Sequence, residues 1–80
     1  MAKVVLPDSF VTVTQGPREL TSNAECYRDL VNELKSKWPA LTEALEKTAV
    51  AIDGQIYQDA WLEPIGPDSE VFFMARIEGG

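Results

Sequence analysis

The chain has 80 residues, of which 45% are hydrophobic. This length allows one domain with a thin core, because a chain of this size buries only about 60% of the surface that its unfolded form exposes. Its 13 acidic and 7 basic residues give a formal charge of −6, which argues against DNA or RNA as a partner; the charge suits docking onto a basic protein surface, or simply keeps a small protein soluble. The chain contains no histidine and no glycine-rich phosphate loop, so we expect no Cys-His nucleophile, no zinc cluster and no bound cofactor, and we predict that it is not an enzyme on its own.

The N-terminal segment predicts a strand at residues 3–6, which are β-branched and apolar and are followed by Pro7 and Asp8. A single lysine and a brief apolar stretch before the proline do not resemble a signal peptide. No apolar run is long enough to cross a membrane, and the single cysteine, Cys26, excludes an internal disulfide. We therefore expect a cytoplasmic protein with no membrane partner.

The second strand has two candidate positions. Residues 10–14 alternate Val and Thr after Phe10 and have strong strand propensity. Residues 18–21, which follow Gly16 and Pro17, are an equally good partner. One of the two segments is expected to form an antiparallel hairpin with the first strand, and local sequence does not choose between them.

Residues 24–37 predict the main helix. Its apolar side chains recur at helical spacing: Tyr27, Leu30, Val31, Leu34 and Trp38. Ser22 or Asn23 can cap the start, and Pro39 ends the helix. A second, short helix is predicted at residues 40–46.

Two further strands are predicted around Asp53 and Gly54, because this dipeptide favours a type I′ hairpin turn with positive φ. The strands cover residues 49–52 and 55–58. Trp61 and Leu62 lie in the connector that follows, and we expect both to pack against the core, as we expect of Trp38. Residues 66–69 predict a tight turn.

The last strand is predicted at residues 70–76, within a domain that spans residues 1–76, and residues 77–80 form a flexible tail. Alternation places Val71, Phe73 and Ala75 on one face and Phe72, Met74 and Arg76 on the other. Both faces are apolar, but one helix covers only one of them. The uncovered face, with Phe72, Met74 and contributions from Val5 or Leu6, is a candidate docking surface unless a loop or a second copy covers it.

Several segments together resemble one family. Residues 27–34 with Trp38-Pro39-Ala40-Leu41 are similar to a helix followed by Tyr-Pro-Gly-Leu, and residues 50–54 are similar to a Val-Ala-Val-Asn-Gly hairpin. Residues 68–71 are similar to Gly-Asp-Glu-Val, and the sequence ends in Gly79-Gly80. These are features of the small sulfur carriers, which include the molybdopterin synthase small subunit and the thiamine-biosynthesis carrier.

The resemblance implies an α+β fold of the ubiquitin-like β-grasp type, with a mixed sheet of four to five strands packed on one main helix. In this alignment the second strand is at residues 18–21, and residues 8–15 form an irregular loop.

The resemblance also implies a function for the C-terminal carboxylate of Gly80. A ubiquitin-activating-type adenylyltransferase adenylates Gly80 with ATP and Mg²⁺, and sulfur from a persulfide enzyme converts the adenylate to a thiocarboxylate. The sulfur then passes to an acceptor held by a synthase subunit. Molybdopterin is the default product, and thiamine or another sulfur metabolite is the alternative.

The glycines fit this role because they lack Cβ and can enter a narrow channel in the partner enzyme. We therefore predict Gly79 and Gly80 as the reacting end, and as partner-binding residues Phe72, Met74, Arg76, Ile77 and Glu78. The family usually has Pro and small residues before its diglycine, and Arg76 and Ile77 are closer to protein modifiers. The alternatives are therefore a ubiquitin-like modifier joined to lysines through Gly80, a non-covalent acidic adaptor, or a diglycine that is incidental.

Overall fold

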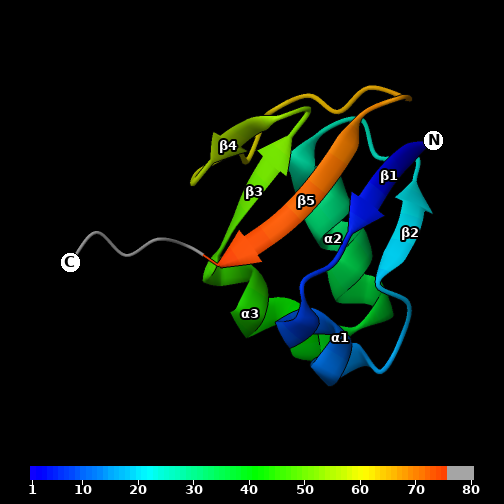
Figure 1. The fold of residues 1–80 in the computed structure, drawn as a ribbon, viewed down its shortest axis with the longest axis vertical. Helices are drawn as coiled ribbons and strands as arrows, with labels where there is room; N and C mark the ends of the chain where they lie inside the picture. The colour runs from blue at the N-terminus through cyan, green and yellow to red at the C-terminus, as the bar shows by residue number, and fades with distance from the viewer. Residues whose placement is uncertain (76–80) are drawn as a thin grey trace.

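The structure is a computed structural model that describes residues 1–75 (Figure 1). Five strands form one sheet in the order β2-β1-β5-β3-β4. The strands are β1 (Ala2–Val5), β2 (Glu19–Ser22), β3 (Thr48–Ile52), β4 (Gln55–Tyr57) and β5 (Glu70–Ala75). β1 and β5 are parallel and all other neighbours are antiparallel, so the sheet is mixed, as predicted. The predicted domain boundary at residue 76 and the predicted tail at 77–80 lie outside the described residues.

The second strand is at Glu19–Ser22, which confirms the later of the two candidate positions and the register that the family resemblance favoured. The earlier candidate, residues 10–14, is part of helix α1 (Asp8–Thr14). The expectation of an irregular loop at residues 8–15 is therefore wrong. The helix begins directly after Pro7, with Asp8 in its first turn, and it ends at Gln15, which has a φ of 53° and donates its N–H to Val11.

The reason for α1 is the burial of Phe10. Its side chain is 1% exposed, and its ring lies 5.5 Å from that of Phe73 on β5. The strand preference of Val and Thr in this segment spans only about 1 kcal/mol, whereas burying an aromatic ring contributes about 1.5–3 kcal/mol. The helical conformation brings Phe10 into the core, so tertiary packing overrides the local preference.

The main helix, α2 (Tyr27–Lys37), begins three residues later than predicted. Its first N–H groups are satisfied from the connector between β4 and β5: Tyr27 N–H donates to the Glu63 carbonyl and Arg28 N–H to the Trp61 carbonyl, both at 2.9 Å. Ser22, predicted as a cap, instead accepts from Ala24 N–H and donates to the Glu33 carboxylate at 2.9 Å. The predicted side-chain cap is therefore wrong, because backbone carbonyls from a distant part of the chain accept the hydrogen bonds of the first N–H groups of α2.

A short helical segment follows α2, as predicted. It consists of a 3₁₀ turn, η1 (Pro39–Leu41), and helix α3 (Thr42–Glu46). Leu41 and Leu45 face the core, at 0% and 6% exposure. The Thr48 hydroxyl donates to the Ala44 carbonyl and so ties the start of β3 to this helix.

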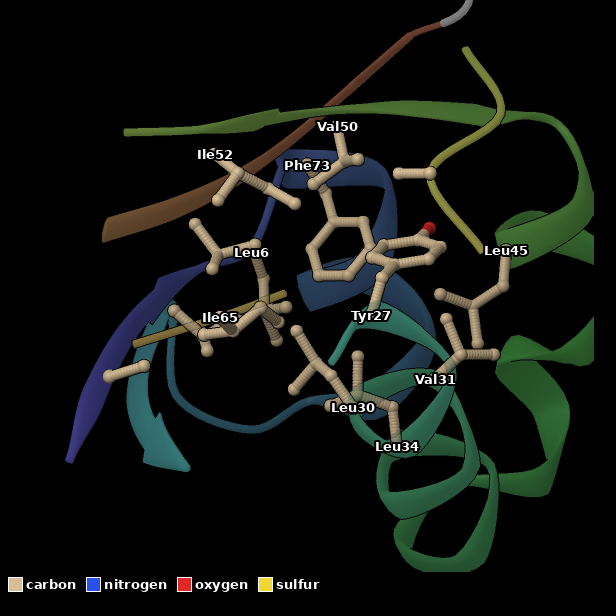
Figure 2. Close-up of a cluster of buried hydrophobic side chains, with 14 of the residues drawn as sticks. Leu6, Tyr27, Leu30, Val31, Leu34, Leu45, Val50, Ile52, Ile65 and Phe73 are labelled. Atoms are coloured by element: carbon tan, nitrogen blue, oxygen red, sulfur yellow. The ribbon is translucent and has the colours of Figure 1, made fainter. Parts of the chain in front are cut away.

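The β3–β4 hairpin has the predicted turn: Asp53 has a φ of 50° and Gly54 a φ of 86°. The core lies between the sheet and α2, and Figure 2 shows Tyr27 and Phe73 at its centre, with ring centroids 5.9 Å apart. Trp38 is half-buried and packs against the core, as predicted. Trp61 and Leu62 are 45% and 69% exposed, so their assignment to the core is wrong.

Candidate docking face of the sheet

The strand that leads toward the diglycine lies in the middle of the sheet. β5 has β1 on one side and β3 on the other, and Phe72 pairs with Val5 and with Ala51. A strand held on both sides has no free backbone edge, so its position is well defined. Ala75 pairs with Thr48 at the end of this strand.

The side chains of β5 alternate as predicted. Val71 and Phe73 face the core, at 0% and 5% exposure, while Phe72 is 38% exposed and Met74 is half-buried on the other side. We call this side the outer face of the sheet. Its apolar members are Val5, Ala49, Ala51, Ile56, Phe72 and Met74.

The outer face presents two large apolar side chains over a floor of small ones. Ile56 is 65% exposed and pairs with Ala51, which in turn lies between Ile56 and Phe72. The two alanines, Ala49 and Ala51, are themselves buried, at 3% and 8% exposure. This shape, with anchors raised beside small residues, suits contact with a partner protein.

The contribution expected from β1 comes from Val5 and not from Leu6. Val5 is half-buried on the outer face, whereas Leu6 is 0% exposed and belongs to the core. Leu6 follows the end of β1, and its N–H donates to the Arg18 carbonyl at 2.7 Å. Period-two alternation from the buried Val4 requires this assignment.

The rim of the outer face is charged. Lys3 on β1 and Glu19 on β2 are diagonal neighbours on this face, and the Lys3 Nζ lies 3.5 Å from the Glu19 carboxylate. Glu70, which pairs with Lys3, adds a negative charge beside it. These side chains are exposed, so the ion pair contributes only about 0–1 kcal/mol. The rim thus carries two acids and one base around the apolar centre.

Two groups of the β3–β4 hairpin have shifted pKa values, Asp53 in the turn and Tyr57 in β4. The Glu70 N–H and then the Ser69 hydroxyl donate to the Asp53 carboxylate and lower its pKa below the ordinary 3.8. Partial burial, and next the charge of Glu63, raise the pKa of Tyr57 above 10.0. Both groups therefore keep their usual charge at neutral pH.

The structure places only part of the predicted site. Phe72 and Met74 lie together on the outer face, whereas Arg76, Ile77, Glu78, Gly79 and Gly80 lie outside the described residues. The sequence analysis missed Ile56 and the two alanines of β3. The alternation of small and large residues in Thr48–Ile52 was a usable signal for the alanines, but Ile56 required the hairpin register.

Within residues 1–75, no group of three or more His, Cys, Asp or Glu side chains is placed to hold a metal ion. In the same part of the chain, no helix has both the length and the apolar character needed to span a membrane.

No protein-family model matches the chain, and no curated protein matches it. Among solved structures, the chain is similar to small archaeal modifier protein 1 from Methanosarcina acetivorans, with a TM-score of 0.80 and 18% identity over 99% of this chain and 95% of that one. It is also similar to small archaeal modifier protein 1 from Haloferax volcanii, with a TM-score of 0.71 and 17% identity over 99% of this chain and 98% of that one. At these identities the likeness shows the fold, which is the predicted ubiquitin-like β-grasp.

Proposed function

We propose that the chain is a sulfur carrier whose Gly80 carboxylate is activated and thiocarboxylated by partner enzymes. An adenylyltransferase of the ubiquitin-activating type joins the carboxylate to AMP from ATP and releases pyrophosphate, with Mg²⁺ on the enzyme. The outer sulfur of a partner enzyme's persulfide then attacks the acyl-adenylate and displaces AMP, which gives an acyl disulfide. A second thiol of the partner reduces this disulfide, forms a disulfide on the partner and leaves the thiocarboxylate on Gly80. The thiocarboxylate delivers its sulfur to an acceptor held by a synthase subunit, and the carboxylate is regenerated. The chain is a recycled cosubstrate and not itself the enzyme, and molybdopterin is the first product to test.

The observation that carries the proposal is the position of the diglycine in a β-grasp fold. Only Arg76, Ile77 and Glu78 separate it from the central strand β5. The outer face beside that strand offers Phe72 as an anchor for a partner. A partner that grips the outer face thus has the diglycine within a short chain length, since each extended residue spans about 3.3–3.6 Å.

The second candidate is a ubiquitin-like modifier that forms isopeptide bonds through Gly80. It is favoured by the two solved structures described above, both of which are named as modifier proteins. The two candidates share the activated carboxylate and differ in the acceptor. A search for lysine adducts that carry the C-terminal peptide of this chain separates them.

The test is chemical labelling of protein with its native C-terminus. The protein is incubated with the adenylyltransferase from its own host, ATP, Mg²⁺ and a sulfur source, and then with a thiol-reactive tag. Cys26 is replaced by Ala, because it is the only cysteine and its side chain makes no capping hydrogen bond. A thiocarboxylate is then the one reactive sulfur on the protein.

A tag located on Gly80 by fragment mass supports the carrier and the free carboxylate that it requires. The matched control carries one extra residue after Gly80 and should take no tag, because its reactive group is now a peptide bond. Tagging of this control at residue 80, or no adenylation of the native form by a competent enzyme, contradicts the proposal. Function that survives deletion of Gly79 and Gly80 indicates a non-covalent adaptor instead.

A further inference from the structure

A groove lies apart from the outer face, between α2, α3 and the connector that follows β4. Its volume is about 220 Å³. Its floor is apolar and consists of Tyr27, Val31, Leu45 and Ala60, each less than 10% exposed. Figure 2 shows Val31 and Leu45 side by side at one end of the core, with Tyr27 next to them. The volume is below the 300–1,000 Å³ typical of small-molecule sites, and it suits a single side chain.

One wall of the groove is the side chain of Trp61, which lies in a tight turn. Glu63 N–H donates to the Ala60 carbonyl at 2.7 Å, which makes Trp61 and Leu62 the central residues of a tight turn. Such positions favour Gly, Pro, Asn, Asp and Ser, so two large apolar residues there have no local conformational reason. Trp61 is nonetheless 45% exposed and Leu62 69% exposed.

The turn is rigidly attached to the rest of the protein. The carbonyls of Trp61 and Glu63 accept the first two N–H groups of α2, each at 2.9 Å. Ile65 N–H donates to the Glu25 carbonyl at 2.9 Å and fixes the far side of the connector. The backbone that carries Trp61 is therefore held before any partner arrives, which lowers the entropy cost of binding.

The groove carries a negative charge. Glu46, Asp59 and Lys35 line it, and Glu63 follows on the same connector. Among the residues that line the groove, two acids and one base leave a net charge of −1 beside the apolar floor. This charge complements a cationic segment and opposes an acidic one.

We propose that this groove binds a segment of a partner protein in which an aromatic or large aliphatic side chain is flanked by Arg or Lys. The apolar side chain fills the floor beside Trp61, and the cationic neighbours lie against Glu46 and Asp59. Tryptophan is one of the residue types in which the hot spots of binding energy at interfaces are enriched. The groove is built from the helices, on the other side of the sheet from Phe72, so the two surfaces can be occupied at once. The inference does not depend on Gly80.

The test is an NMR titration of the full ¹⁵N-labelled chain with a defined probe, the capped pentapeptide Gly-Arg-Phe-Arg-Gly. The amides of Val31, Leu45 and Trp61 should shift, with a Kd of about 1 mM or tighter. The matched probes are Gly-Glu-Phe-Glu-Gly, which should bind much more weakly, and Gly-Arg-Gly-Arg-Gly, which should not shift the floor residues.

Variants of the protein then locate the binding. Trp61→Ala should weaken it at least about tenfold, and Asp59→Lys and Glu46→Lys should each weaken it about two- to fivefold. Ile56→Ala, which removes an apolar side chain of the outer face that is even more exposed than Trp61, should leave it unchanged.

Four outcomes overturn the proposal. They are no shift of the floor amides at about 10 mM peptide, equal binding of the acidic and basic probes, shifts confined to the outer face, and self-association of the chain through Trp61. The last of these would identify a second copy as the occupant. Trp61 is 45% exposed, so the Trp61→Ala variant should stay folded. The NMR spectrum of the variant checks this and excludes unfolding as the cause of weaker binding.

Discussion

The Ser69 hydroxyl donates a hydrogen bond of 2.8 Å to the Asp53 carboxylate, and it thereby joins two turns that are sixteen residues apart in the chain. The same carboxylate accepts the Glu70 N–H at 3.0 Å, and the Ser69 oxygen accepts the Gly66 N–H at 2.8 Å. This cluster holds the β3–β4 hairpin turn against the start of the central strand β5. It therefore sets the register of the strand that carries Phe72.

Ser69→Ala should destabilise the protein by roughly 1–3 kcal/mol, because it leaves the Gly66 N–H and part of the Asp53 carboxylate without their partner. Ser69 is 7% exposed, so water does not readily replace the lost hydroxyl. Urea denaturation measures the change. Ser36→Ala, at an exposed position of α2, is the matched control and should change stability by no more than about 0.5 kcal/mol. Equal effects of the two substitutions would contradict the role of the cluster.

The Asp53 carboxylate should make stability depend on pH in the acid range. Its pKa in the folded protein is lowered from 3.8, so the folded state binds a proton less readily than the unfolded state. The contribution is complete above pH 3.8 and is lost as the pH falls through the lowered pKa. Asp53→Asn keeps a residue type that tolerates the observed positive φ. The difference in denaturation midpoint between the wild type and this variant should shrink as the pH falls below 3.8. A difference that stays constant with pH would argue against this assignment.

Phe10→Ala should cost about 3–5 kcal/mol, the range for removal of a buried phenylalanine. The substitution removes the ring contact between Phe10 and Phe73 that joins α1 to the central strand β5. Val13→Ala on the same helix should cost far less, because that side chain is 45% exposed. Calorimetry or urea denaturation of the pair checks the prediction. Similar costs for both would indicate that α1 is not anchored by Phe10.

Phe72→Ser should lower the kcat/KM of adenylation by the cognate activating enzyme at least about tenfold, if the outer face is where that enzyme binds. The side chain is 38% exposed, so the fold should persist. Val13→Ser removes a comparably exposed apolar group on α1, away from the outer face, and should leave kcat/KM unchanged. If the two variants react at the same rate, the enzyme approaches from another side.

Local sequence determined those elements whose chemistry lies within a few residues. The spacing of apolar residues in α2 fixes its buried face, since the helical period is a property of the backbone. Asp53-Gly54 specifies the hairpin because few residues accept positive φ at both turn positions. Alternation in β5 placed Phe72 and Met74 together on the outer face. The functional expectation for Gly80 remains a prediction from sequence and family resemblance.

Tertiary structure alone decided the features that depend on residues far apart in the chain. Residues Asp8–Thr14 became a helix because Phe10 is buried against Phe73, a gain that exceeds their local strand preference. The start of α2 moved because carbonyls from the β4–β5 connector satisfy its first N–H groups. The same contacts hold Trp61 at the surface, although its large apolar side chain favours the core. Such contacts form only after the fold has brought distant segments of the chain together, so a local sequence pattern does not predict them.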